Sequence, residues 1–216
     1  MEFDIHVFEC GNCGVKSHQW VLISYMDDGR TDGELKPSAY GSIAEAFVQN
    51  CPDCGYCAKR ITVAPGEGKK AIGGEEYRKI LEMGDSAPGG REEQAVNRTT
   101  LRISPEGAAL FYQESDPKLE NFFLCDSLLL GINGKLTEAG WSALNAAWIC
   151  DQFYLFEKAA YCREKALSLF RKAREMGHVL YGKGERDCTL LAEIEKRAVS
   201  KGEKDGIWGG RYGGRE

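Results

Sequence analysis

The sequence has little of what marks several common classes of protein. It contains only three His among 216 residues, and it has no run of about 20 apolar residues that could cross a bilayer. The first residues, Met1–Asp4, lack the basic start and the apolar run of a secretory signal peptide. We therefore expect a cytoplasmic protein with no membrane partner, in a compartment where thiols stay reduced.

Basic charge is scarce as well, since the formal net charge is −5. Nucleic-acid-binding proteins usually carry a basic patch, and neither residues 1–70 nor the remainder has an excess of Lys and Arg. The sequence also lacks the motifs H-E-x-x-H, G-x-S-x-G and G-x-x-x-x-G-K-[ST]. With so few His and none of these motifs, we expect a protein without enzymatic activity.

Cysteine, in contrast, is abundant, with nine in the chain. An odd number cannot pair completely within one chain, and clustered Cys in a reducing compartment indicates metal or redox chemistry. Two clusters, at residues 10–14 and 51–55, share the pattern C-x-x-C-G. Two residues between the thiols let one tight turn direct both sulfurs at one ion. The Gly that follows suits a positive φ, which turns backbone amides toward the sulfurs.

Two such turns supply the four thiolates of a structural zinc site. We therefore predict that four residues bind Zn²⁺: Cys10, Cys13, Cys51 and Cys54. The 37 residues between the clusters exceed the usual spacing, and we expect an inserted hairpin at Val15–Lys36 to absorb them. Each doubling of a loop costs only ~0.6 kcal/mol, whereas a structural zinc contributes on the order of 10–16 kcal/mol.

Four alternatives stay open at this site. Cys57 forms a third C-x-x-C with Cys54 and could replace a ligand, and so could His18. The same four thiolates could hold iron, as in rubredoxin. Cys51-Pro52-Asp53-Cys54 also resembles the C-P-x-C dithiol of glutaredoxin-type oxidoreductases, although that motif needs a βαβ unit that the sequence does not predict. For Cys125, Cys150, Cys162 and Cys188 we expect buried, inert thiols.

The pattern of residue types divides the chain into four parts and predicts an α+β fold. Residues 1–64 are rich in β-formers and turn signals, and residues 116–201 repeat apolar residues at helical spacing. Residues 65–115 form a mixed connecting segment, and residues 202–216 lack a core pattern and are expected to be disordered. The expected architecture is a small β-rich zinc ribbon followed by an antiparallel helical bundle.

Capping residues and glycines set the expected helix limits. A short helix is expected at Glu75–Met83, and Ala44–Gln49 fits either a helix or a strand. Four longer helices are expected. The first runs from Asp116-Pro117 to a stop at Gly131-Ile132-Asn133-Gly134, and the second from a Thr137 cap through Trp148. The third runs from about Phe156 to Met176, and the fourth from about Glu185 to Ser200.

Two of these helices carry spacings that fit a tetratricopeptide-type repeat. In one helix the small residues Ala166 and Ala173 would let a neighbouring helix approach closely, and Phe170 would fill the gap beyond them. The preceding stripe consists of Trp141, Leu144 and Trp148. An ordinary amphipathic helical hairpin explains the same pattern equally well. Four helices make about two repeat units, and repeats usually need three or more for stability.

The combination of motifs resembles a bacterial family of unknown function that joins a split zinc ribbon to tetratricopeptide-like helices. The resemblance is carried by residues 8–14, by C-P-x-C-G-Y at 51–56, by Ala146-Ala147-Trp148 and by residues 164–167. It would cover roughly residues 5–200. It implies zinc at the four matching Cys and a bacterial, cytoplasmic setting, and it implies no established activity. Cys57 departs from the family pattern, in which a small residue is more usual.

These observations favour a zinc-stabilised interaction protein whose helices bind a peptide or protein partner or a second copy of the chain. The second hypothesis is a redox protein, with either iron or a dithiol at the Cys clusters. The third is nucleic-acid binding through the ribbon, Lys59-Arg60, Lys69-Lys70 and the Gly/Arg tail with Trp208 and Tyr212.

Overall fold

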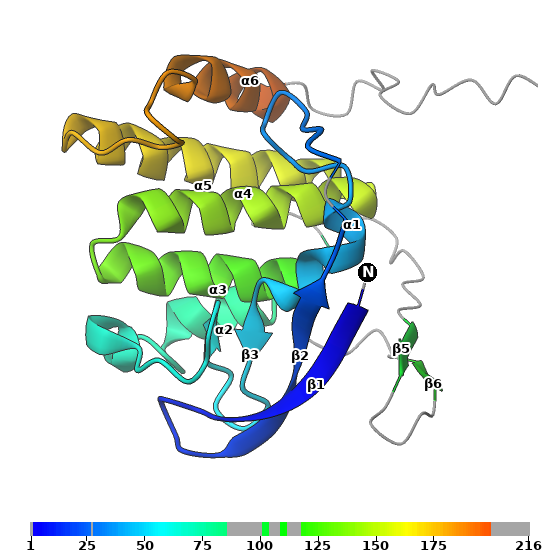
Figure 1. The fold of residues 1–216 in the computed structure, drawn as a ribbon. Helices are drawn as coiled ribbons and strands as arrows, with labels where there is room; N and C mark the ends of the chain where they lie inside the picture. The colour runs from blue at the N-terminus through cyan, green and yellow to red at the C-terminus, as the bar shows by residue number, and fades with distance from the viewer. Residues whose placement is uncertain (1, 27, 86–100, 104–108, 112–117, 200–216) are drawn as a thin grey trace, which may run out of the picture.

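The computed structural model describes residues 2–26, 28–85, 101–103, 109–111 and 118–199. It confirms the α+β class, because small antiparallel strand pairs at the N-terminus are followed by a bundle of helices (Figure 1). The predicted disordered tail, with Trp208 and Tyr212, lies outside the described residues, and so does most of 86–117. No helix in the described part of the chain is long and apolar enough to cross a membrane.

Within the described ranges, the strands form three separate antiparallel pairs. β1 (Glu2–Glu9) pairs with β2 (Lys16–Ser24), β3 (Gln49–Asn50) with β4 (Cys57–Ala58), and β5 (Leu101–Ile103) with β6 (Ala109–Phe111). The predicted hairpin within Val15–Lys36 is therefore wrong. Its apolar strand pairs instead with β1, in a register that places Glu9 opposite Lys16 and closes around the first Cys cluster.

Short helices connect the strand pairs to the bundle. α1 (Tyr40–Ile43) runs into the 3₁₀ helix η1 (Ala44–Ala46), so the ambiguous Ala44–Gln49 segment is helical at its start and joins β3 at its end. A second 3₁₀ helix, η2 (Gly66–Lys70), precedes α2 (Glu75–Leu81), which matches the short helix expected there.

The four long helices agree closely with the sequence pattern. They are α3 (Leu119–Ile132), α4 (Leu136–Gln152), α5 (Phe156–Glu175) and α6 (Asp187–Val199). Gly177, with φ of +82°, follows the end of α5 as expected. The predicted Thr137 cap is wrong. Lys135 is the N-cap, and Thr137 lies in the first turn, where its Oγ1 is buried without a hydrogen-bond partner among the described residues.

Each long helix packs against the next, and Figure 1 shows α3, α4 and α5 as successive layers with α6 beyond them. The expected close approach between α4 and α5 occurs at Gly140. A methyl group added there would lie 2.5 Å from the ring of Phe170. Ala166, Phe170 and Ala173 are fully buried, and Leu144 and Trp148 are buried on the facing side of α4. The small residues therefore set the distance between these two helices.

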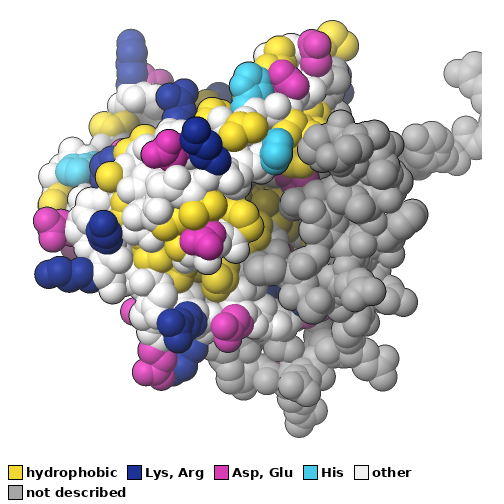
Figure 2. Space-filling view, turned by 90° about the horizontal axis from the view of Figure 1, so that it is seen from below, with side chains coloured by type: hydrophobic (Ala, Val, Ile, Leu, Met, Phe, Trp, Pro, Cys, Tyr) yellow, Lys and Arg dark blue, Asp and Glu magenta, His cyan; other side chains and the backbone are white. Residues whose placement is uncertain are grey.

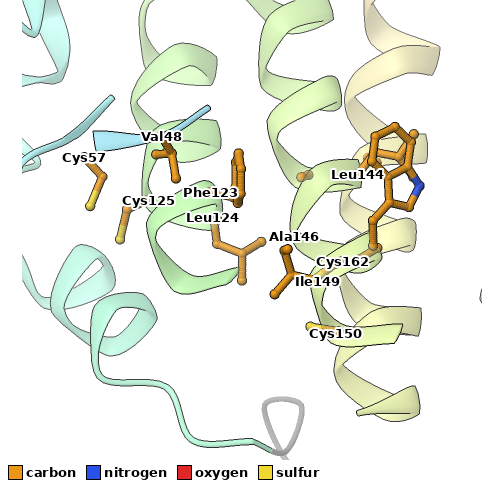
Figure 3. Close-up of a cluster of buried hydrophobic side chains, with 14 of the residues drawn as sticks. Val48, Cys57, Phe123, Leu124, Cys125, Leu144, Ala146, Ile149, Cys150 and Cys162 are labelled. Atoms are coloured by element: carbon orange, nitrogen blue, oxygen red, sulfur yellow. The ribbon is translucent and has the colours of Figure 1, made fainter. Parts of the chain in front are cut away.

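The ribbon and the helices share one hydrophobic core, to which Tyr40, Ile61 and Tyr77 contribute from the N-terminal half. Figure 3 shows two pairs of buried thiols in this core. Cys57 lies beside Cys125, and Cys150 lies beside Cys162. Burial is the main cause that raises the pKa of Cys125 and of Cys150, and the hydrogen bond with the neighbouring thiol raises it further. Cys125 and Cys150 thus act as neutral apolar groups. The prediction of a buried Cys188 is wrong, since that thiol is exposed.

A buried ionic cluster attaches the loop after β2 to the far side of the bundle. Glu34, which is fully buried, accepts two hydrogen bonds from Arg163 of α5, at 2.6 and 2.8 Å. Its Oε2 also accepts from Trp148 Nε1 at 3.1 Å and from Arg197 of α6 at 3.2 Å. Arg163 pairs in addition with Asp151 at 2.5 Å. One carboxylate therefore connects the N-terminal loop to α4, α5 and α6.

Candidate metal centre

The two C-x-x-C-G segments fold into the same turn. In the first, the N–H of Cys10 donates to Val15 O at 2.9 Å, and that of Gly14 donates to Cys10 O at 2.8 Å. In the second, Cys51 N–H donates to Tyr56 O and Gly55 N–H to Cys51 O, both at 2.9 Å. The glycines have φ of +78° and +71°, as the sequence pattern predicts. Each turn ends a strand of one antiparallel pair and begins its partner.

The two turns face each other and bring four thiols together. Cys10 Sγ lies 3.8 Å from Cys54 Sγ, and Cys13 Sγ lies 3.7 Å from Cys51 Sγ. All four sulfurs lie within 4.8 Å of one another. A tetrahedral ion with metal–sulfur bonds of about 2.3 Å separates its ligands by about 3.8 Å. The arrangement therefore has the dimensions of a tetrathiolate metal site.

Residues between the paired Cys support the sulfurs by hydrogen bonds. Asn12 donates its backbone N–H to Cys10 Sγ at 3.4 Å, and its side chain is hydrogen-bonded to Cys54. Burial raises the pKa of Cys54, but the bonds from Asn12, from the Tyr56 backbone and from neighbouring thiols outweigh this effect and lower it overall. At Cys54 such bonds favour the thiolate, which is the form that binds a metal, whereas burial raises the pKa of Cys51.

The two alternative ligands lie elsewhere. Cys57 is buried at the start of β4, where its thiol contacts Gly55 O and Asn50 Nδ2, each at 3.2 Å. It faces α3 and belongs to the pair with Cys125. His18 is exposed on β2, opposite Val7. Neither side chain joins the four-thiol group.

Helix α2 holds the second Cys turn through one side chain that sequence reasoning missed. The hydroxyl of Tyr77 accepts a hydrogen bond from Cys57 N–H and donates one to Gly55 O, both at 2.9 Å. The first turn is held by Gly11, whose N–H donates to Ile61 O at 2.7 Å. An added methyl group at Gly11 would lie 2.7 Å from the backbone of Val63. Neither partner lies near in sequence, so no local pattern marks them.

We expect Gly14→Ala to weaken metal binding by about tenfold, because an L-residue in the left-handed region costs about 1–2 kcal/mol. Nothing lies within 4 Å of an added methyl group at this position, so the cost is purely conformational. Gly134→Ala is the matched control, since Gly134 has φ of +74° and is equally open. Both variants should lose similar thermal stability. Competition with a chelator should show weaker metal retention only for Gly14→Ala, and equal retention by the two variants would contradict the prediction.

Comparison of the chain with family models, with curated proteins and with solved structures gave no significant match. The resemblance to the bacterial ribbon-and-helix family therefore stays a prediction, and the site is interpreted from its own geometry.

Proposed function

We propose that this protein is a zinc-stabilised, non-enzymatic scaffold that binds a protein partner through its helical region. The observation that carries the proposal is the meeting of four thiols from two matching turns, within 4.8 Å of one another. Four protein thiolates complete the coordination of a tetrahedral zinc ion and leave no position for a substrate. The role that follows for the metal is structural.

The surroundings of the four thiols support this role over the dithiol alternative. Cys51 and Cys54 lie in a turn between β3 and β4, whereas a reactive C-x-x-C dithiol is activated at the N-terminus of a helix. The turn is also held against α2 and the common core by Tyr77. A metal at this position would join the two turns to each other, and Tyr77 links the second turn to α2.

The distribution of charge supports a protein partner over a nucleic acid. On the face shown in Figure 2, the Lys and Arg side chains of the described residues are interspersed with Asp and Glu side chains. Nucleic-acid-binding surfaces usually gather basic side chains in one patch or stripe.

Elemental analysis of the purified full-length chain, with an absorbance spectrum of the same sample, tests the proposal. The expected result is about one zinc per chain and no visible absorption, as a closed tetrathiolate site predicts. Iron with visible thiolate bands would overturn the proposal in favour of electron transfer. A chain that holds no metal, with all nine thiols free when the protein is denatured, would overturn it as well.

A further inference from the structure

A cavity of about 680 Å³ lies between the ribbon and the helices, away from the four thiols. Its floor is formed by α3 and α4, one wall by residues 56–65, and its far end by residues 35–47. Ligand-binding pockets usually have volumes of about 300–1,000 Å³. We call this cavity the groove.

The groove has the length of a short extended peptide. Its lining on α3 runs from Phe123 to Leu130, and its lining on α4 runs from Glu138 to Trp148. At a rise of 1.5 Å per residue these stretches span about 10–15 Å. An extended chain covers that distance with about three to five residues.

Aromatic rings line the groove, and their polar atoms are already hydrogen-bonded within the protein. Tyr56 donates its hydroxyl to Val63 O at 2.9 Å, and Trp141 Nε1 donates to Leu180 O at 3.0 Å. Trp148 Nε1 donates to the buried Glu34. Tyr40, Tyr56 and Trp148 are at most 4% exposed and form the base of the groove. The apolar surface within reach of a ligand comes from the half-buried Leu35, Phe47 and Trp141, and it suits large apolar side chains.

Charge is concentrated at one part of the groove. Among the lining residues that the structure describes, the exposed bases are Lys59, Arg60 and Lys135, and the one exposed acid is Glu138. The fifth charged residue, Asp126, is buried. Burial raises the pKa of Asp126 to about 6, although a hydrogen bond from Ser142 and the charges of Lys59 and Lys135 oppose this effect.

The opposite end of the groove is aromatic, and its described lining includes no charged residue. There the ring of Tyr40 stacks on Phe47 with centroids 6.0 Å apart, and it meets Trp148 edge to face at 4.9 Å. The groove thus has an apolar end and an end with excess positive charge. This polarity favours a ligand with apolar side chains at one end and carboxylates at the other.

The wall of the groove is continuous with both metal-binding turns. Tyr56 follows the second turn directly, and Ile61 is bonded to Gly11 of the first. The wall is also held to the end of α3, because Asn133 Nδ2 donates to Pro65 O at 3.0 Å. Formation of the thiolate centre therefore positions the residues that close the groove on this side.

We propose that the groove binds an extended peptide segment of a partner protein that carries large apolar side chains next to Asp or Glu. The apolar side chains occupy the aromatic end, and the carboxylates lie beside Lys59, Arg60 and Lys135. This inference rests on the proposed function, because it specifies the site and the chemistry of the protein partner.

Selection from a random ten-residue peptide library displayed on phage, with the metal-loaded full-length chain as bait, tests the inference. The expected consensus contains two or three large apolar residues with Asp or Glu on one side. Lack of enrichment, or a consensus without acidic residues, would overturn the inference.

Charge-reversal variants then locate the binding of the synthetic consensus peptide. Lys59→Glu/Lys135→Glu changes the rim of the groove, and Lys172→Glu/Lys183→Glu makes the same change at exposed positions outside its lining. Calorimetric titration should show peptide affinity reduced at least tenfold in the first double variant and less than twofold in the second. Equal losses in both variants would show that the peptide responds only to net charge, which would overturn the assignment to the groove.

The metal content of each sample separates this inference from the proposal on which it rests. A chain that retains zinc and selects no peptide overturns the inference and leaves the structural zinc site intact. A chain that holds no metal but binds the peptide with the expected pattern overturns the zinc proposal and supports the groove.

Discussion

Replacement of Glu34 by alanine is expected to lower the free energy of unfolding by about 3–5 kcal/mol, which is the usual effect of removing one partner of a buried ion pair. The carboxylate is fully buried and forms its shortest bond, 2.6 Å, with Arg163. Without it, Arg163 keeps Asp151 as its one anionic partner among the described residues, and Trp148 Nε1 loses the acceptor Glu34 Oε2. The cost arises from the buried polar groups left behind.

Urea denaturation of the variant and of an exposed counterpart measures this effect. Glu195 pairs with Arg171 at 2.9 Å, and more than half of each side chain is exposed. Glu195→Ala should therefore cost no more than about 1 kcal/mol. Similar losses for the two variants would show that the buried cluster does not hold the loop. Glu34→Gln separates charge from shape, and we expect it to lie between wild type and Glu34→Ala.

Cys51→Ser is expected to have the second large effect, because it removes one of the four thiols that meet at the candidate centre. The apparent binding energy of a structural zinc is about 10–16 kcal/mol, which exceeds the total stability of about 5–15 kcal/mol of an ordinary domain. We expect loss of the metal and unfolding of the strand pairs β1–β2 and β3–β4. The helices α3–α5 should keep much of their structure, because Leu124, Leu144 and Phe170 are buried among them.

Hydrogen exchange followed by mass spectrometry distinguishes these regions. In Cys51→Ser, amides of residues 2–24 and 49–58 should exchange at nearly the rate of an unfolded chain, while those of α4 and α5 stay protected. Cys188→Ser is the matched control, since its thiol is exposed on α6 and lies outside the four-thiol group. A Cys51→Ser protein with unchanged protection and thermal stability would show that the metal does not support the fold.

Features that depend on local sequence could be predicted. The turn at each C-x-x-C-G segment could be predicted, because the spacing of the two Cys and the positive φ of the Gly depend on five consecutive residues. The long helices could be recognised because apolar residues repeat over several turns, as at Trp141, Leu144 and Trp148. The four thiols that the structure brings together are the four that the sequence nominates.

Features that depend on distant residues could not be predicted. The local sequence around Glu34 is that of an exposed acid, because its partner Arg163 lies 129 residues further along the chain. Tyr77 gives no local sign that its hydroxyl holds the second Cys turn. The pairing of β1 with β2 did have a signal, because Phe3, Ile5 and Val7 alternate with polar residues at the period of a strand. The expected hairpin within the gap between the Cys clusters did not take this alternation into account.

The buried carboxylate of Glu34 also affects the order of events when the chain is synthesised. Both Cys turns and the acidic loop leave the ribosome early, but Arg163 and Arg197 follow 129 and 163 residues after Glu34. The loop therefore stays hydrated until Arg163 and Arg197 have been translated, because its carboxylate can leave water only when its cationic partners are present. The two Cys turns can meet once residues 1–64 have been made, whereas docking of the loop must wait for residues at least 129 positions further along the chain.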